Sequence, residues 1–298
     1  SAEALAWELA QKAGGSSGDD RSNAVAVDSN GDVYVTGAFE QTATFGSTTL
    51  TTAGNDDIFV AKMSSSGSWL WAVTAGGNYE SDSGNSIWYD GNGGAYVAGQ
   101  FNISGTFGAN GHGTNGDTDA FIAHIGSTGT WNWVAKGGGP GSDSADGVTT
   151  DSAGDLRVMG TFVTGTTQAA QFGSSSFNAV GSPDLFVSKI SSSGSWVWTK
   201  TAGAPSGMTL PWGFDTEGTD SYVGGLFTGT ANFDSHSITS GASDNNAFIA
   251  KIDGTGAWQW ADAFQIGNDG QLCLTLASNY TNESGDISDN TNDNYRKA

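Results

Sequence analysis

Apolar and polar positions alternate along the chain in short runs that are separated by turns rich in Gly and Asn. In one stretch, the run NSIWYD at 85–90 precedes the turn GNGG and the run AYVAGQF at 95–101. After an insertion rich in Gly, Asn and Thr, the runs DAFIAHI at 119–125 and TWNWVA at 130–135 flank the turn GSTG. Such runs, bounded by turn residues, predict four antiparallel β-strands. No segment has the sustained 3.6-residue period of a helix, so we expect an all-β chain.

The same set of runs occurs four times. A pair of tryptophans ends each copy, and Leu5/Trp7 marks a fifth, frayed copy; the four complete pairs are Trp69/Trp71, Trp131/Trp133, Trp196/Trp198 and Trp258/Trp260. The second members stand at 7, 71, 133, 198 and 260, which gives steps of 64, 62, 65 and 62 residues. A run of the DIFVAK type precedes each complete pair. Landmarks in a fixed order at this period predict a chain of structural repeats.

A four-stranded unit cannot bury both of its faces alone, and repeats of this kind bury them by packing side by side around an axis. We therefore predict a β-propeller with four complete four-stranded blades, at about 23–73, 85–136, 146–201 and 212–263. The chain ends supply a partial fifth blade, formed within the chain or by strand exchange. The propeller covers 1–279, and a polar tail covers 280–298.

The tryptophan pairs are expected to pack between blades. Residues i and i+2 of a strand lie on the same face, so both members of a pair should contact one neighbouring blade. Large aromatic side chains contribute strongly to such contacts. The alternative is an exposed platform on which sugars stack.

The repeat resembles that of the bacterial β-propeller repeat proteins, the SBBP type. The matching stretches include NAVAVDSNGDVYVTGAF at 23–39 with DIFVAKMSSSGSWLW at 57–71, and the resemblance covers roughly 5–263. It implies a propeller fold and an exported or surface location, but it implies no activity. One departure is His124, which stands where the other copies have Lys62, Lys189 and Lys251.

Two fragments remain at the chain ends. Residues 3–12 match only the outermost strand of a blade, with Leu5, Trp7 and Leu9 as its apolar positions. Residues 271–279 match only an innermost strand, with Leu272, Leu274 and Leu276. The two halves can close a fifth blade within one molecule. Alternatively, a terminal strand docks on another copy, because an unpaired strand edge accepts strands and a head-to-tail contact that does not close produces a filament.

Charge limits the partners. Thirty-one acidic and 10 basic residues give a formal net charge of −21, which disfavours nucleic acid and anionic membrane surfaces. No apolar run is long enough to cross a membrane, so no membrane insertion is expected. A chain poor in Lys, rich in Gly and Ser and starting at Ser suggests a secreted, cell-surface bacterial protein. The single cysteine, Cys273, lies in an apolar alternation and is expected to be buried.

The sequence predicts no catalytic residues and no enzyme, because the three histidines have no metal-binding or triad spacing. Calcium is a candidate ligand at Asp28, Asn30 and Asp32, which place oxygen atoms at alternate positions of a Gly-containing loop. The alternative is ordinary turn chemistry, since Asp and Asn bond their own backbone in such loops.

Five positions fit short glycosylation patterns. The candidates for N-linked sugar are Asn102, Asn279 and Asn282, and those for O-linked sugar are Ser144 and Ser152. The favoured function is a non-enzymatic extracellular structural or adhesive module, the subunit of a fibre that assembles with copies of itself. The main alternative is a monomeric propeller that binds glycans or surface proteins, and the third is a glycoside hydrolase or lyase.

Overall fold

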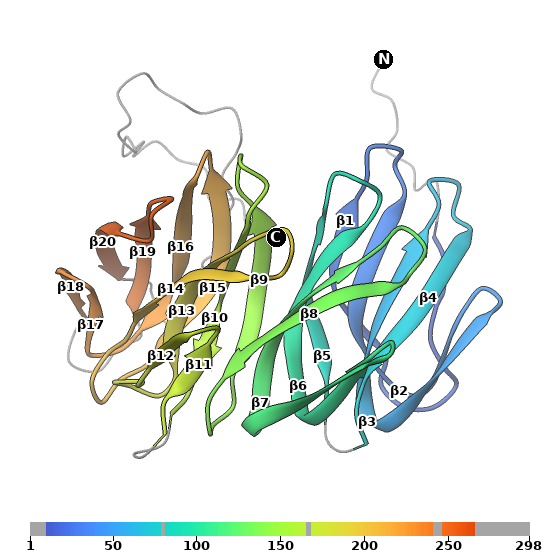
Figure 1. The fold of residues 1–298 in the computed structure, drawn as a ribbon, viewed down its shortest axis with the longest axis horizontal. Coiled ribbons are helices and arrows are strands. Elements are labelled where there is room, and N and C mark those ends of the chain that lie inside the picture. The colour runs from blue at the N-terminus through green and yellow to red at the C-terminus, as the bar shows by residue number, and fades with distance from the viewer. Residues whose placement is uncertain (1–9, 79–80, 165–167, 241–245, 266–298) are drawn as a thin grey trace.

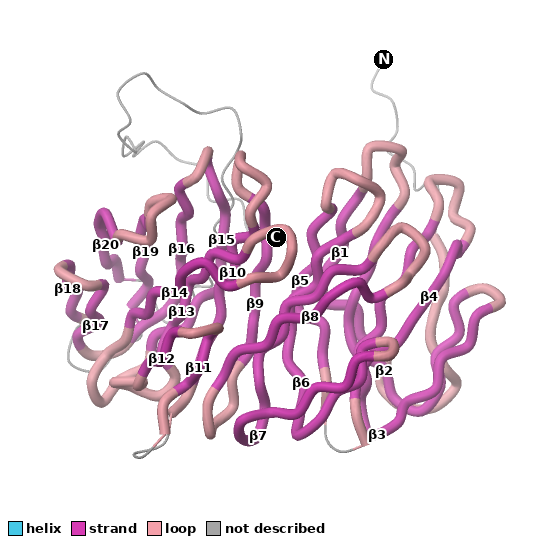
Figure 2. The backbone as a smooth tube through the Cα atoms, in the orientation of Figure 1, coloured by secondary structure: helices cyan, strands magenta, loops and turns pink. Residues whose placement is uncertain are grey.

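The chain folds into β-strands. The computed structural model describes residues 10–78, 81–164, 168–240 and 246–265, and these ranges contain twenty strands and no helix (Figures 1 and 2). All strand pairings are antiparallel, which confirms the predicted all-β class.

Sixteen of the strands form four units of four strands, and each unit is paired in chain order. Unit 1 contains β1 (Arg21–Val27), β2 (Val33–Phe45), β3 (Thr48–Met63) and β4 (Trp69–Gly76). Unit 2 contains β5 (Ser83–Tyr89), β6 (Ala95–Phe107), β7 (Asn110–Ile125) and β8 (Trp131–Gly138). Unit 3 contains β9 (Ser144–Thr150), β10 (Leu156–Phe162), β13 (Asp184–Ile190) and β14 (Trp196–Ala202). Unit 4 contains β15 (Thr209–Glu217), β16 (Asp220–Phe227), β19 (Asn246–Ile252) and β20 (Trp258–Gln265).

The insertion of each repeat, for which the sequence analysis predicted no strands, is a β-hairpin. In units 1 and 2 it prolongs the second and third strands, and in units 3 and 4 it forms the separate hairpins β11 (Ala170–Phe172) with β12 (Ser175–Phe177) and β17 (Thr230–Phe233) with β18 (His236–Thr239). The hairpin reaches back to the preceding unit, where Thr106 pairs with Gly76 and Gln171 with Gly138. Units 2, 3 and 4 are therefore each joined to the preceding unit by backbone pairing.

Residues 10–15 repeat this pairing ahead of unit 1. Gly14 pairs with Thr44 of the first hairpin, as Gly76 pairs with Thr106. Trp7 precedes Gly14 by the same number of residues as Trp69 precedes Gly76, so it holds the first position of a tryptophan pair and not the second. With that correction the first step of the repeat becomes 62 residues and equals the next.

Separate hydrophobic cores lie between successive units. One core joins unit 1 to unit 2, a second joins unit 2 to unit 3, and a third joins unit 3 to unit 4. A fourth, smaller cluster lies on the face of unit 1 that points away from unit 2, where no described unit comes before unit 1. Units 1 and 4 stand at opposite ends of the row and share no core within the described ranges (Figure 1).

The two members of each tryptophan pair point to opposite faces of their strand, contrary to the prediction of a common face. A β-bulge shifts the register between them, so that Trp69 pairs with Met63 while Trp71 pairs with Lys62. The same shift occurs in units 2, 3 and 4. As a result Trp69 packs against Phe45 on one face, and Trp71 joins the core shared with unit 2 on the other.

Candidate assembly site

The junction between two units contains a repeated hydrogen bond from the second tryptophan of the pair. The indole N–H of Trp71 donates to the carbonyl oxygen of Ser127 in unit 2 over 2.9 Å, and that of Trp133 donates to Ser192 in unit 3 over 3.2 Å. Trp198 donates to Gly254 in unit 4 over 3.3 Å. Each tryptophan therefore fixes its unit to the last turn of the next one.

A glycine in that turn makes room for the tryptophan ring. Gly129 has a φ of +79°, and a Cβ atom there would lie 3.0 Å from the Trp71 ring. Gly194 and Gly256 hold the same position with φ values of +87° and +86°, under Trp133 and Trp198. Both the backbone conformation and the close contact require glycine.

A second polar contact crosses two of the three junctions, closer to the innermost strands. The hydroxyl of Tyr34 donates to the carbonyl oxygen of Gly93 in unit 2. In unit 3 the corresponding residue is Arg157, which is fully buried and donates to the carbonyl oxygen of Thr219 in unit 4 over 2.7 Å. Chemically different side chains thus serve one function in the repeat.

A basic side chain contacts a carboxylate inside each unit, between the first turn and the third strand. Lys62 lies 2.9 Å from Asp28, His124 lies 2.8 Å from Asp90, and Lys251 lies 2.9 Å from Asp220. The structure confirms that His124 replaces the lysine of the repeat. In unit 3, Lys189 lies 2.8 Å from Asp155 and 3.3 Å from Asp151.

The candidate calcium loop is occupied by the ion pair of Lys62 with Asp28. The ammonium group of Lys62 lies 2.9 Å from Asp28 and 3.3 Å from Asp32, and the backbone N–H groups of Asn30 and Asp32 donate to Asp28. Burial raises the pKa of the Asp28 carboxyl, but the hydrogen bonds from Lys62 and the backbone outweigh it and hold the pKa below its usual value. Within the described ranges no group of three or more His, Cys, Asp or Glu side chains is placed to hold a metal ion.

Buried aspartates that the sequence analysis did not single out bond backbone groups at the end of one unit and in the next unit. Asp82 accepts hydrogen bonds from the backbone of Gly77 and Asn102 over 2.8 and 2.7 Å, and Asp143 does the same for Gly139 and Val163. Burial raises the pKa of both carboxyls to about 7. Their only sequence signal is an acidic residue shortly before the first strand of a unit.

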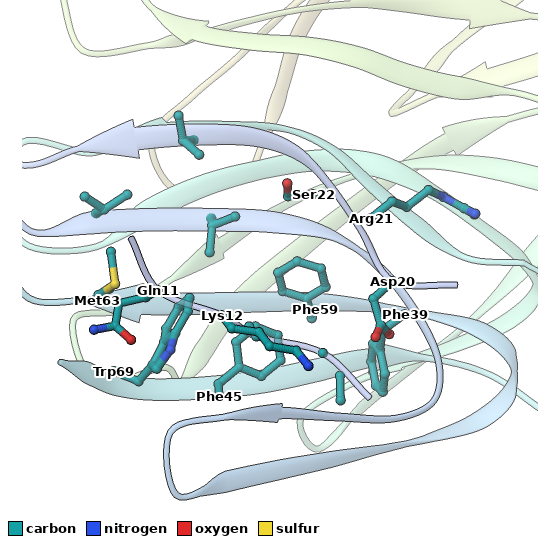
Figure 3. Close-up of a pocket in the computed structure, with 16 residues that line it drawn as sticks. Gln11, Lys12, Asp20, Arg21, Ser22, Phe39, Phe45, Phe59, Met63 and Trp69 are labelled. Carbon is teal, nitrogen blue, oxygen red and sulfur yellow. The ribbon is translucent and has the colours of Figure 1, made fainter. Parts of the chain in front are cut away.

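A groove opens on the face of unit 1 that points away from unit 2, and we call it the N-terminal groove (Figure 3). It has a volume of about 400 Å³ and is bounded on one side by residues 11–14. Its apolar lining includes Val25, Val33, Val35, Phe45, Met63 and Trp69. Val25 is 65% exposed, so this face of β1 is open to solvent.

The opposite end of the row also presents apolar side chains, on the face of unit 4 that points away from unit 3. We define this C-terminal face by Tyr222, Ile249, Trp260 and Phe264. Phe264 is 40% exposed, and the other three are half-buried. Lys251 lies 5.4 Å from the centroid of the Tyr222 ring and adds a positive charge beside the face.

The remaining predicted positions fall into two groups. Asn102 is buried and its amide donates to Thr118 over 3.3 Å, so the folded protein does not present this nitrogen for glycosylation. Ser144 donates to Asp146 over 2.6 Å, and Ser152 is exposed. The other predicted positions lie outside the described residues; they are Leu5, Trp7, Leu9, Leu272, Leu274, Leu276, Asn279 and Asn282.

No helix among the residues that the structure describes has the length and apolar composition needed to span a bilayer. No curated protein matches the chain. Among solved structures, the chain is similar to a protein of unknown function from Bacteroides caccae, with 12% sequence identity and a TM-score of 0.37 over 82% of this chain and 81% of that one.

The sequence pattern of a known repeat family, described as "Beta-propeller repeat" (SBBP), matches residues 10–38. The matched stretch runs from the segment that pairs with the first hairpin, through β1 and into β2. The chain therefore carries the SBBP-type β-propeller repeat that its sequence resembles.

Proposed function

We propose that the chain is a non-enzymatic structural module with four propeller blades, units 1–4, and that copies of it join end to end through their terminal strands. In this proposal Leu5, Trp7 and Leu9 anchor one terminal strand, and Leu272, Leu274 and Leu276 anchor the other. The two strands meet in a fifth blade that is shared between neighbouring copies. The assembly is a secreted surface fibre whose partner is the chain itself.

The single observation that carries the proposal is the contrast between the sealed junctions and the open ends. Three junctions bury their apolar residues in continuous cores, whereas the N-terminal groove leaves Val25 65% exposed. Burial of apolar surface contributes about 25 cal/mol per Å², so an apolar face of this kind favours association. Residues 11–14 line the groove, and Gly14 forms an isolated antiparallel bridge with Thr44 there.

The chemistry of the histidines agrees with a structural role. His124 bonds Asp90, His236 contacts the backbone oxygen of Trp258, and His112 packs against Phe107. All three serve contacts within or between the repeated strands.

Electron microscopy and light scattering on the purified chain, with and without residues 1–12, test the proposal. We expect regular fibres from the full chain and folded monomers from the truncated one. Monodisperse monomers in both samples would contradict it and would favour closure of the fifth blade within one molecule. Fibres in both samples would show that the N-terminal strand is not the link.

A further inference from the structure

The first strand of every unit contains a β-bulge. The bulged residues are Asn23, Asn85, Asp146 and Trp212. In units 1 and 2 this residue is an asparagine that carries a hydrogen bond across the junction to the next unit. In unit 3 it is an aspartate, so a carboxyl group stands where the repeat has an amide donor.

In unit 1 the bulged residue bonds the first strand of unit 2. The amide of Asn23 donates to the hydroxyl of Ser83 over 3.0 Å and to the carbonyl oxygen of Gly84 over 2.9 Å. Both acceptors lie at the start of β5. The contact therefore fastens one innermost strand to the next.

In unit 2 the same contact recurs. The amide of Asn85 donates to Ser144 over 3.0 Å and to the carbonyl oxygen of Ala145 over 3.3 Å. The Ser144 hydroxyl in turn donates to Asp146 over 2.6 Å. A chain of hydrogen bonds thus runs from unit 2 into unit 3 and ends at the carboxyl group of Asp146.

The junction between units 3 and 4 has the acceptor of this contact but not its donor. Pro211 pairs with the same glycine of the repeat as Gly84, so its carbonyl oxygen holds the acceptor position in unit 4. Leu210 replaces the serine that precedes the acceptor in units 2 and 3, so no hydroxyl accompanies the carbonyl. Within the described ranges no hydrogen bond from Asp146 reaches unit 4, since an ionised carboxylate carries no donor.

Strands β9 and β15 already touch at this position. A Cβ atom on Gly147, which follows Asp146, would lie 3.5 Å from Phe214 of β15. Further along, the Thr216 hydroxyl donates to the carbonyl oxygen of Thr150 over 3.1 Å. These contacts hold residue 146 beside the start of β15.

We propose that Asp146 is a proton-controlled switch between units 3 and 4: when its carboxyl takes up a proton from solvent, the O–H donates to the carbonyl oxygen of Pro211 and completes the junction. When the proton leaves, the carboxylate faces that carbonyl oxygen without a donor, and the bond is lost. The inference does not depend on end-to-end assembly, because every group in it belongs to one chain.

The surroundings of Asp146 set the pH at which the switch acts. Burial raises the pKa of its carboxyl from 3.8 to about 6, although the hydrogen bond from Ser144 acts in the opposite direction. Because the folded-state pKa lies above the unfolded value, the stability that the protonated group contributes is present at low pH and is lost as the pH rises to about 6.

Other ionisable groups lie on the strands packed against β9, but none of them is among the causes of this shift. They are Tyr89 on β5, Tyr96 on β6, His112, Asp117, Asp119 and His124 on β7, Arg157 on β10, and Asp215 and Glu217 on β15.

Removing the charge without changing the shape of the side chain tests the switch. Asp146→Asn supplies the amide that units 1 and 2 use, so we expect it to melt at a higher temperature than the native chain. The gain should be about 3 °C larger at pH 8 than at pH 5, because the native carboxyl is ionised in the folded chain only at the higher pH. Asp117→Asn makes the same change in charge at an exposed position and should gain nothing. No gain, or an equal gain at both pH values, would contradict the switch.

Asn85→Asp is the reciprocal change. It places a carboxyl group at the junction between units 2 and 3, where the native chain has the amide donor. We expect a lower melting temperature than that of the native chain, with a larger loss at pH 8 than at pH 5. If this variant melts like the native chain at both pH values, the amide contact contributes nothing and the proposal fails.

Carbon-13 NMR follows the bond itself. In the native chain the carboxyl resonance of Asp146 should titrate with a midpoint of about pH 6. The carbonyl resonance of Pro211 should shift with the same midpoint, because that oxygen gains and loses a donor. In Asp146→Asn the Pro211 resonance should not follow this titration. A Pro211 resonance that stays constant while Asp146 titrates would show that the proton forms no bond to unit 4, and would overturn the proposal.

Discussion

The indole N–H of Trp71 in unit 1 donates a 2.9 Å hydrogen bond to the carbonyl oxygen of Ser127 in unit 2. This bond joins the last strand of one unit to the last turn of the next, and the ring covers Gly129 of that turn. The same contact occurs at all three junctions. Substitutions at this contact therefore test how much a junction contributes to the stability of the protein.

Replacing the glycine under the tryptophan should weaken the junction. We expect Gly129→Ala to lower the free energy of unfolding by about 2–5 kcal/mol, as the sum of a left-handed backbone conformation and a Cβ atom 3.0 Å from the Trp71 ring. Gly154→Ala is the control, since Gly154 has a φ of +83° and no atom within 4 Å of the added Cβ. Chemical denaturation measures both. Equal losses would mean that the ring contact contributes nothing.

Arg157 should tolerate only the residue that the other units use. Its guanidinium lies 3.1 Å from Asp151 and 4.9 Å from the centroid of the Trp198 ring, in a fully buried position. Arg157→Ala should cost about 3–5 kcal/mol, because it removes one partner of a buried ion pair. Arg157→Tyr restores the side chain found at positions 34, 96 and 222 and should recover part of that loss. A tyrosine variant no more stable than the alanine variant would contradict this equivalence.

Stability should rise as the pH falls from about 8 to 5. Burial raises the pKa of Asp82 and of Asp143 from 3.8 to about 7. A folded-state pKa above the unfolded value means that the fold prefers the protonated carboxyl, so this stability is present at low pH and is lost as the pH rises towards 7. The carboxylates of Asp57 and Asp56 near Asp82 act in the same direction.

Thermal melts across this range provide the measurement. We expect the melting temperature to be at least about 3 °C higher at pH 5 than at pH 8, which corresponds to roughly 1 kcal/mol in a chain of this size. Asp82→Asn should flatten the dependence, whereas Asp117→Asn, at an exposed position, should leave it unchanged. If the melting temperature of Asp82→Asn depends on pH as strongly as that of the native chain, groups other than Asp82 cause the dependence.

Calcium should not stabilise the native chain through the first turn. The Lys62 ammonium already pairs with Asp28 and Asp32, and a divalent cation would have to displace it. We expect the same melting temperature in millimolar calcium and in chelator, and a drop of several degrees for Lys62→Met. If calcium raises the melting temperature of Lys62→Met but not that of the native chain, the Lys62 ammonium takes the place of a bound cation in this turn.

The strands and their grouping could be predicted from the sequence because apolar alternation and turn residues recur in fixed order. The hairpins were missed because short Thr- and Gly-rich strands carry little apolar signal, although Phe45 and Phe107 stand in them at equivalent positions. The orientation of Trp69 against Trp71 was wrong because a single bulge reverses the side-chain alternation, and bulges leave no mark in the apolar pattern.

The candidate site was predictable in outline only. The tryptophans and the unmatched chain ends pointed to contacts between repeats, and His124 was correctly assigned to the lysine position. The buried carboxyls of Asp82 and Asp143 could not be identified, since their burial depends on backbone groups from two units that the hairpin brings together.

The separation of the hydrophobic cores makes the number of units adjustable. Each core belongs to one pair of neighbours, so duplicating a unit inside the row would add one more core of the same kind and disturb none of the others. Gene duplication could therefore lengthen or shorten this protein one repeat at a time, with its stability growing in proportion to the number of neighbouring pairs.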